Sequence, residues 1–301
     1  KRKHLSGKLE KPLKEFNIDR MLNLRIVKQH GQFYAVFGVE KEVPDKKGIK
    51  KIIALDPNHK NLSYGVGSDS IATEVANPWF LKKLDRYIDT LKTRRDRCQR
   101  KSKKRVSEGG KEYWLPSRRW SFFHSKLENL YRIRRDQTKA YLYAIANRLY
   151  REYDLVAIGD YTPSGGGINK GMRRSMNNES LIGRFKDVLS WVALKSGKHY
   201  EQWDEKGSTK TCHSCGFKHE KSIDPSIRHW KCPDCEQIHI RDENAAINGL
   251  IRTLKNKKMH GSCRLGAVVS RRAWRFTGLG IDEMPGASDS DIQQWAQASG
   301  N

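Results

Sequence analysis

Short apolar runs separated by turn residues dominate the first quarter of the chain, and this pattern predicts β-strands. Residues 21–43 hold two β-rich runs, MLNLRIVKQ and QFYAVFGVEKE, and His30-Gly31 between them predicts a hairpin turn. Within residues 51–77, the runs IIALD, LSYGVGS and ATEVAN predict three more strands. Further along, LVAIGD predicts a buried strand and HYEQWD a short one.

Apolar residues at helical spacing then predict four helices. The first covers residues 79–105, with Leu81, Leu84, Ile88 and Leu91 on one face. The others cover residues 117–152, 179–195 and 242–254. Together the strands and helices predict a mixed α/β fold.

The charge of the chain indicates a polyanionic partner. Its 301 residues include 59 Lys and Arg against 34 Asp and Glu, a formal net charge of +25, and nucleic acid is the usual partner of such a protein. A membrane surface is the rival, but no long apolar run or basic amphipathic anchor stands out, so we expect no membrane partner.

The charged faces of the first two helices are either solvated surface or the lining of a nucleic-acid groove. The groove interpretation assigns nucleic-acid contacts to Arg94, Arg95, Arg97, Arg100, Lys103, Lys104, Arg118 and Arg119.

A glycine-rich stretch, SGGGINKGMRR at residues 164–174, does not match a phosphate-binding Walker loop. It is either a disordered connector or a mobile lid. As a lid, it would bring Lys170, Arg173 and Arg174 to the nucleic acid.

Four cysteines form two knuckles, Cys212-x-x-Cys215 and Cys232-x-x-Cys235. A two-residue gap lets both sulfurs of a knuckle reach one ion, so the spacing predicts a structural Zn²⁺ site with all four as ligands. A redox dithiol and disulfides are the alternatives. The remaining cysteines, Cys98 and Cys263, are not needed for the zinc site. Because four of the six cysteines are assigned to zinc, we expect a reducing, cytoplasmic compartment.

Three carboxylates stand where a metal-dependent nuclease would need them. Asp56 ends the strand IIAL, Asp160 ends LVAIG, and Asp242 begins the last helix. Mg²⁺ prefers oxygen ligands, and two such ions can activate water and stabilise the leaving oxygen of a phosphodiester. Each residue also has a plain structural interpretation, as a turn residue, a strand exit and a helix N-cap respectively.

The strings ALDPNHKN, LVAIGDYTP, STKTCHSCG…CPDC and RDENAAINGL, in this order, resemble the C-terminal half of TnpB proteins and type V CRISPR effector nucleases. The resemblance covers about residues 20–255. It implies a RuvC nuclease domain of RNase H-like fold, split by a zinc-ribbon insertion, that cuts target DNA chosen by a guide RNA. Asp56 and Asp242 match the first and third catalytic acids of the family.

The resemblance also gives a domain division. Its segments are residues 1–48 as the end of a wedge β-barrel, 49–203 as the first part of the RuvC domain, 204–240 as the zinc ribbon, 241–256 as the final RuvC helix and 257–301 as a basic, then acidic, disordered tail. The family's recognition domain and first wedge strands would precede Lys1. A prokaryotic, nucleoid-associated protein of a transposable element or a CRISPR locus is implied.

One departure from the family pattern concerns the second acid. The family usually has Glu at this motif, whereas the sequence here reads Ile158-Gly159-Asp160. Either Asp160 replaces the Glu, or Gly159 does and the acid is lost. An intact site predicts a Mg²⁺-dependent endodeoxyribonuclease, and a lost acid predicts a guided DNA-binding protein that does not cut. A DNA transposase is a weaker alternative, since no separate helix-turn-helix reader is recognisable.

Overall fold

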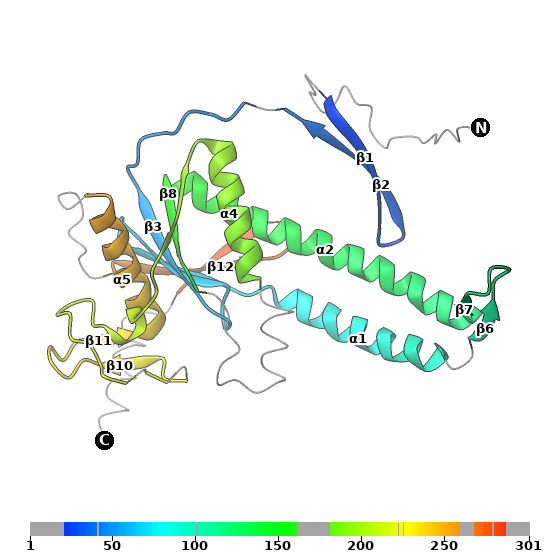
Figure 1. Ribbon diagram of the computed structural model, residues 1–301. Coiled ribbons are helices and arrows are strands. Elements are labelled where there is room, and N and C mark those ends of the chain that lie inside the picture. The colour runs from blue at the N-terminus through cyan, green and yellow to red at the C-terminus, as the bar shows by residue number, and fades with distance from the viewer. Residues whose placement is uncertain are drawn as a thin grey trace. The chain divides into compact units, whose positions relative to one another are not determined.

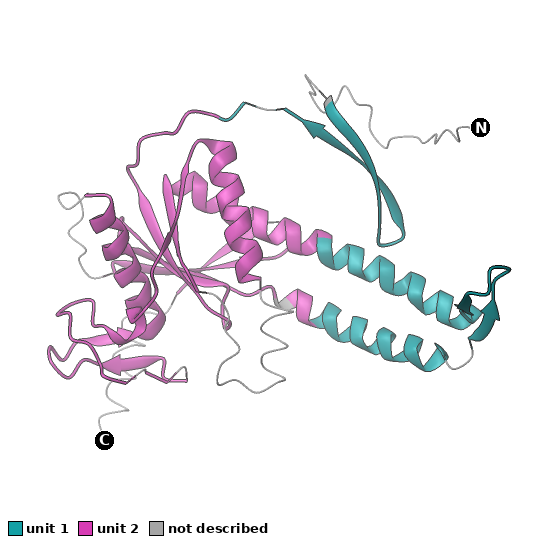
Figure 2. Ribbon diagram, in the orientation of Figure 1, with its two compact units in different colours: residues 1–43, 83–135 teal, residues 44–82, 136–301 magenta. Residues whose placement is uncertain are grey.

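The computed structural model describes residues 21–40, 42–99, 102–161, 181–221, 223–224, 226–258, 268–278 and 280–286 (Figure 1). It divides into two compact units, residues 1–43 with 83–135 and residues 44–82 with 136–301 (Figure 2). In the part of the chain that is described, no helix combines the length and the apolar character needed to cross a membrane.

The first unit contains the predicted hairpin, formed by β1 (Met21–Gln29) and β2 (Gln32–Val39). The strands are antiparallel, with Gln29 opposite Gln32. His30 and Gly31 between them have φ values of 50° and 73°, the left-handed conformations that a two-residue hairpin turn requires.

Most of α1 (Trp79–Gln99) and of α2 (Arg118–Glu152) belongs to the same unit. The two helices pack through buried Ile88, Leu91 and Leu127. The Arg134 guanidinium donates two hydrogen bonds to Asp85, at 2.5 and 3.1 Å, and so fixes the register of the two helices.

The first helix ends earlier than its charge pattern predicted. Instead of continuing to residue 105, α1 stops at Gln99, and Lys103 and Lys104 lie in a strand, β6 (Lys103–Val106), that pairs with β7 (Glu112–Leu115). The reason is local: a Gly-Gly turn, with Gly110 at φ 75°, joins two short segments that pair across it.

The second unit is built on a seven-stranded sheet in the order β13-β12-β5-β4-β3-β8-β9. Its centre is an antiparallel meander of β3 (Ile52–Pro57), β4 (Ser63–Gly67) and β5 (Ile71–Val75), and β8 (Leu155–Gly159) and β9 (His199–Trp203) continue it in parallel with β3. Three antiparallel strands followed by two parallel ones are the RNase H-like arrangement. The mixed α/β prediction is confirmed.

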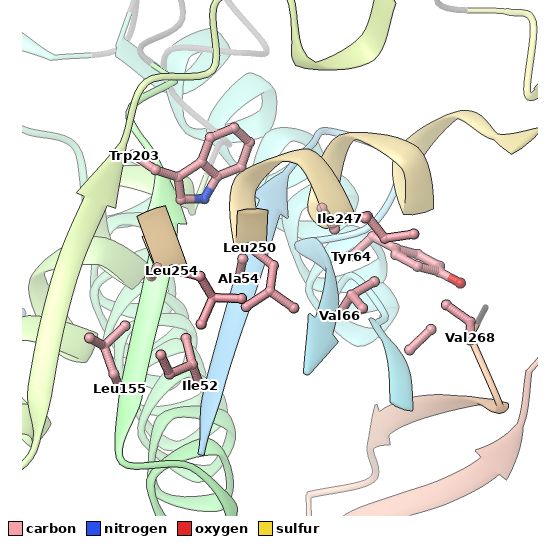
Figure 3. Packing of buried hydrophobic residues seen from close by; sticks show 13 residues of the cluster. Ile52, Ala54, Tyr64, Val66, Leu155, Trp203, Ile247, Leu250, Leu254 and Val268 are labelled. Atoms are coloured by element: carbon pink, nitrogen blue, oxygen red, sulfur yellow. The ribbon is translucent and has the colours of Figure 1, made fainter. Parts of the chain in front are cut away.

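Helix α5 (Arg241–Asn256) packs on one face of this sheet (Figure 3). Ala246, Leu250 and Leu254 of α5 pack on Ile52 and Ala54 of β3 in one buried cluster. All of β3 is buried, as expected for a central strand covered on both faces. Phe185, Leu189 and Val192 form the buried side of another helix, α4 (Ile182–Ser196).

The segment expected to be a disordered tail contributes two strands. β12 (Ser270–Phe276) pairs in parallel with β5, and β13 (Ile281–Pro285) pairs with β12. The charged composition of this segment suggested disorder, but the side chain of Trp274 is fully buried. Its basic residues also find carboxylate partners, since Arg272 pairs with Glu152 at 2.5 Å.

Candidate active site

The four cysteine side chains converge in the second unit, between the end of β9 and the start of α5. Their sulfurs all lie within 4.8 Å of one another, with 3.7 Å between the sulfurs of Cys212 and Cys235 and of Cys215 and Cys232. A tetrahedral site with Zn–S bonds of about 2.3 Å requires sulfurs ~3.8 Å apart. The donor set and its spacing therefore fit Zn²⁺, and four thiolates leave no coordination position open for chemistry.

Two short strands, β10 (His229–Lys231) and β11 (Ile238–Ile240), carry the residues packed around the cysteines. Trp230 is buried with Cys212 and Cys232. The Nε2 atom of His239 lies 3.1 Å from Cys212 Sγ, where an imidazole N–H can donate to a thiolate. Burial, and then the neighbouring His213 ring, lowers the pKa of His239 to about 4, so its ring is neutral at pH 7.

Two of the predicted acids lie close together at one end of the sheet. Asp56 is near the end of β3 and Asp242 is in the first turn of α5, and both are buried. Burial, and then the negative charges of Glu205 and Asp242, raises the pKa of Asp56 well above its usual value. Among the described residues, only the cysteines bring three or more potential metal ligands within 4.8 Å, so the carboxylates form a wider cluster.

A third acid near Asp56, Glu205, was not singled out by the sequence analysis. It follows the end of β9, which runs parallel to β8 and β3, so its carboxylate lies at the same end of the sheet as Asp56. Its side chain fills the space beside Gly159, because a Cβ built on that glycine would lie 1.7 Å from Glu205 Oε1. The usable signal was a glycine at the second motif together with an acid just after the neighbouring parallel strand.

The Glu205 carboxylate is in an environment that suits a metal ligand. Its Oε1 atom is buried and has no hydrogen-bond partner among the described residues. Burial raises the pKa of Glu205 to about 7; the Lys186 ammonium opposes this rise and the Asp160 carboxylate adds to it. A buried carboxylate oxygen without a donor is costly, and a bound cation would remove that cost.

Asp160 has a different place from the other two predicted acids. Its side chain is exposed, and its Oδ1 accepts a hydrogen bond of 3.0 Å from the backbone N–H of Glu205. Its own N–H donates to Trp203 O, at 2.9 Å. Asp160 thus fastens the start of the loop that carries Glu205.

A cation from the zinc-ribbon segment contacts the third acid. Arg228 donates from Nη1 to Asp242 Oδ2 at 3.1 Å, and Asn58 Nδ2 lies 3.5 Å from the same oxygen. The guanidinium balances the charge of Asp242 and limits the directions in which its carboxylate can turn.

The basic residues expected to contact nucleic acid lie in the first unit where they are described. Most of them are exposed, on α1, β6 and α2: Arg94, Arg97, Lys103, Lys104, Arg118 and Arg119. Arg95 is half-buried, pairs with Asp96 at 2.7 Å and lies 5.8 Å from the centre of the Trp120 ring. The other members of the set, Arg100, Lys170, Arg173 and Arg174, lie outside the described residues, as does Cys263.

Comparison with known proteins supports the resemblance. A family described as "Cas12f1-like, TNB domain" matches residues 183–249. The chain is 29% identical over 185 residues to "Putative RNA-guided DNA endonuclease Rv2885c" of Mycobacterium tuberculosis, which covers 59% of this chain and 38% of that protein. It is 26% identical over 180 residues to a TnpB-like protein of Acanthamoeba polyphaga mimivirus, covering 58% of this chain and 30% of that protein.

Among solved structures, a CRISPR-Cas12f ternary complex matches with a TM-score of 0.45 and 16% identity, over 72% of this chain and 41% of that chain. A score this low does not establish a common fold, so the sequence matches carry the assignment. They confirm the resemblance to TnpB proteins and type V effectors. The chain spans well under half the length of these relatives.

Proposed function

We propose that this chain is the nuclease part of an RNA-guided DNA endonuclease of the TnpB type. The sequence relatives support the class of activity, and the placement of Glu205 carries the proposal that the site is intact. The second-motif glycine alone would have indicated a site without its acid. The Glu205 carboxylate occupies the space that a side chain at position 159 would take, so it supplies an acid from the loop after β9.

In this proposal Asp56, Glu205 and Asp242 are the ligands of the catalytic Mg²⁺ ions. They come from three different elements, the end of β3, the loop after β9 and the start of α5. Asp160 positions Glu205 by accepting the hydrogen bond from its backbone N–H. The competing assignment, with Asp160 itself as the second ligand, requires its exposed carboxylate to turn away from that hydrogen bond.

Bound Mg²⁺ would supply a Lewis acid and an activated water for hydrolysis of the phosphodiester. The protein's own contribution is orientation and charge. Arg228 holds the Asp242 carboxylate and places a positive charge beside the cluster, where it can attract the DNA backbone. The raised pKa of Glu205 means that metal binding must displace a proton from this carboxyl near neutral pH.

The partners in this proposal are a guide RNA and a target DNA, in the cytoplasm at the nucleoid. The exposed cations of α1, β6 and α2 contact the phosphates of these nucleic acids. The Zn²⁺ site is structural and supports the segment that contacts Asp242.

The test begins with the RNA that copurifies when the protein is produced together with its native flanking DNA. That RNA is sequenced, and DNA matching its guide end is offered to the complex with Mg²⁺ or with EDTA. Mg²⁺-dependent cleavage that Asp56→Ala abolishes supports the endonuclease. Guide-dependent binding without any product would instead support the non-cutting alternative, and absence of copurified RNA would contradict both.

A further inference from the structure

Two asparagines of α5 join the zinc ribbon to the helix that carries Asp242. Asn244 and Asn248 are one helical turn apart, so they face the same way, and both are buried, at 1% and 7% exposure. Neither forms part of the carboxylate cluster or of the cysteine cluster. Their amide groups instead lie against Ser208 and Thr211, the residues that lead into the first knuckle.

The two asparagine amides donate to the same pair of backbone carbonyls. Asn244 Nδ2 donates to Ser208 O at 3.1 Å and to Thr211 O at 2.9 Å, and Asn248 Nδ2 donates to the same two carbonyls at 2.9 and 2.7 Å. Each carbonyl has two lone pairs, and the two amides fill both of them. This clamp, as we call the set of bonds made by Asn244 and Asn248, holds the backbone just before Cys212 to the face of α5.

The clamp also reaches into the first knuckle itself. The Asn244 Oδ1 atom accepts from the backbone N–H of His213 at 3.0 Å and lies 3.1 Å from the Nδ1 atom of the same residue. His213 directly follows Cys212, and its ring meets that of His239 edge to face, with centroids 4.7 Å apart. His239 in turn contacts Cys212 Sγ. The amide of Asn244 is therefore satisfied on both its oxygen and its nitrogen by the zinc ribbon.

Asp242 lies two residues before Asn244, within the first turn of the same helix. A helix transmits a shift of one residue to the next turn, because its backbone hydrogen bonds keep its shape. Arg228 lies between the two knuckles. Its guanidinium donates to the Asp242 carboxylate, and its backbone carbonyl accepts a hydrogen bond from the Arg241 N–H at 2.8 Å. The ribbon thus holds the start of α5 from two sides.

We propose that Asn244 and Asn248 are positioning residues that couple the zinc site to the carboxylate site, so that an ordered zinc ribbon is needed to place Asp242 for metal binding. The inference rests on the proposed function, because it takes Asp242 as a ligand of the catalytic metal. Coupling of this kind is reciprocal: zinc tightens cation binding at the carboxylates, and a cation there tightens zinc.

The test measures Mn²⁺ binding to the full, zinc-loaded chain by electron paramagnetic resonance of the free ion, with zinc content determined in parallel. In Asn244→Ala/Asn248→Ala the four thiolates remain, so we expect one full equivalent of zinc. The Mn²⁺ dissociation constant should rise about 10- to 100-fold, the usual effect of removing groups that orient metal ligands. Thr253→Val is the matched control, since Thr253 is buried on the same helix and its hydroxyl donates within that helix, to Gly249 O.

Removing zinc with a chelator should raise the Mn²⁺ dissociation constant of the native chain by a similar factor. In the double variant, zinc removal should raise this constant little further. If the double variant fails to fold or to retain zinc, Asn248→Ala decides, because it leaves every bond of Asn244 in place; we expect a rise of roughly tenfold there. Wild-type Mn²⁺ affinity in a zinc-loaded clamp variant would overturn the inference. Mn²⁺ binding that Asp56→Asn and Glu205→Gln leave unchanged would overturn the proposed metal site instead.

Discussion

Gly159 and Glu205 share one space: a side chain at position 159 would collide with the Glu205 carboxylate, its Cβ 1.7 Å from Oε1. The two positions are 46 residues apart in the sequence, yet Gly159 ends β8 and Glu205 lies just after the end of the neighbouring parallel strand β9. An acid at one of them therefore excludes an acid at the other. This relationship explains how the chain can have glycine at the second motif and still present a third carboxylate near Asp56 and Asp242.

Exchange of the two residues tests this relationship directly. Gly159→Glu alone should disrupt the site through the collision, and Glu205→Gly alone should remove the acid. The double variant Gly159→Glu/Glu205→Gly should recover cleavage relative to either single change, because the acid then enters the same space from β8. Guide-dependent cleavage rates for the four proteins form a double-mutant cycle. Additive losses would show that the positions do not share a role.

Glu205→Gln should lower the cleavage rate by about 100-fold or more while guided DNA binding stays close to the native value, since metal ligands act on the chemical step. Asp204→Asn, at an exposed carboxylate next to it, is the control and should cut normally. Asp160→Ala should lower the cleavage rate less than Glu205→Gln does, because it removes the hydrogen bond that positions Glu205 and leaves the Glu205 carboxylate in the chain. A larger loss for Asp160→Ala would favour Asp160 as the ligand.

The raised pKa of Glu205 predicts how stability depends on pH without metal. The unfolded carboxyl loses its proton near its ordinary pKa of 4.5, while the native one keeps its proton until about pH 7. Between these values the native state binds more protons, so the free energy of unfolding should fall as the pH rises. Asp56, whose pKa is also raised, acts in the same direction. Urea unfolding of native and Glu205→Gln chains in EDTA should show a shallower slope for the variant.

Cys232→Ser should lower the zinc content and destabilise the ribbon, because a tetrahedral site that loses one of four thiolates binds Zn²⁺ far more weakly. Cys98→Ser is the control, since Cys98 lies in α1 and outside the cysteine cluster. Zinc per chain, measured by a colorimetric chelator after denaturation, checks both. A full equivalent of zinc in Cys232→Ser would contradict the assignment.

Charge reversal at exposed Arg94 and Arg97 should weaken RNA binding and make its salt dependence less steep. Each lost phosphate contact should lower the slope of log affinity against log salt by about 0.7 to 0.9. Lys231→Glu, in the zinc ribbon, changes the net charge by the same amount per residue and is the control for that effect. Equal losses at both places would indicate general attraction without a localised nucleic-acid surface.

The sequence predicted the parts of the fold whose pattern is local. The apolar run ending at Asp56 and the strong amphipathic helix after Asp242 lie where they were expected. The glycine at the second motif was visible in the sequence, but the proximity of Glu205 to it depends on which strand lies beside β8, and that is a property of the tertiary fold. Lys103 and Lys104 were assigned to a helix because charge alone does not distinguish an exposed helix face from an exposed hairpin.

The parallel pairing of β12 with β5 has a consequence for how the protein is made. Arg272 bonds to Thr73 across a separation of 199 residues, so this part of the sheet cannot form until β12 has also left the ribosome. Until then β5 is an uncovered edge with unpaired backbone groups, a place where another strand can pair wrongly. Contacts between such distant residues also slow folding. We expect the seven-stranded sheet to be completed late, after synthesis of β12 and β13, and β5 to depend on chaperones in the meantime.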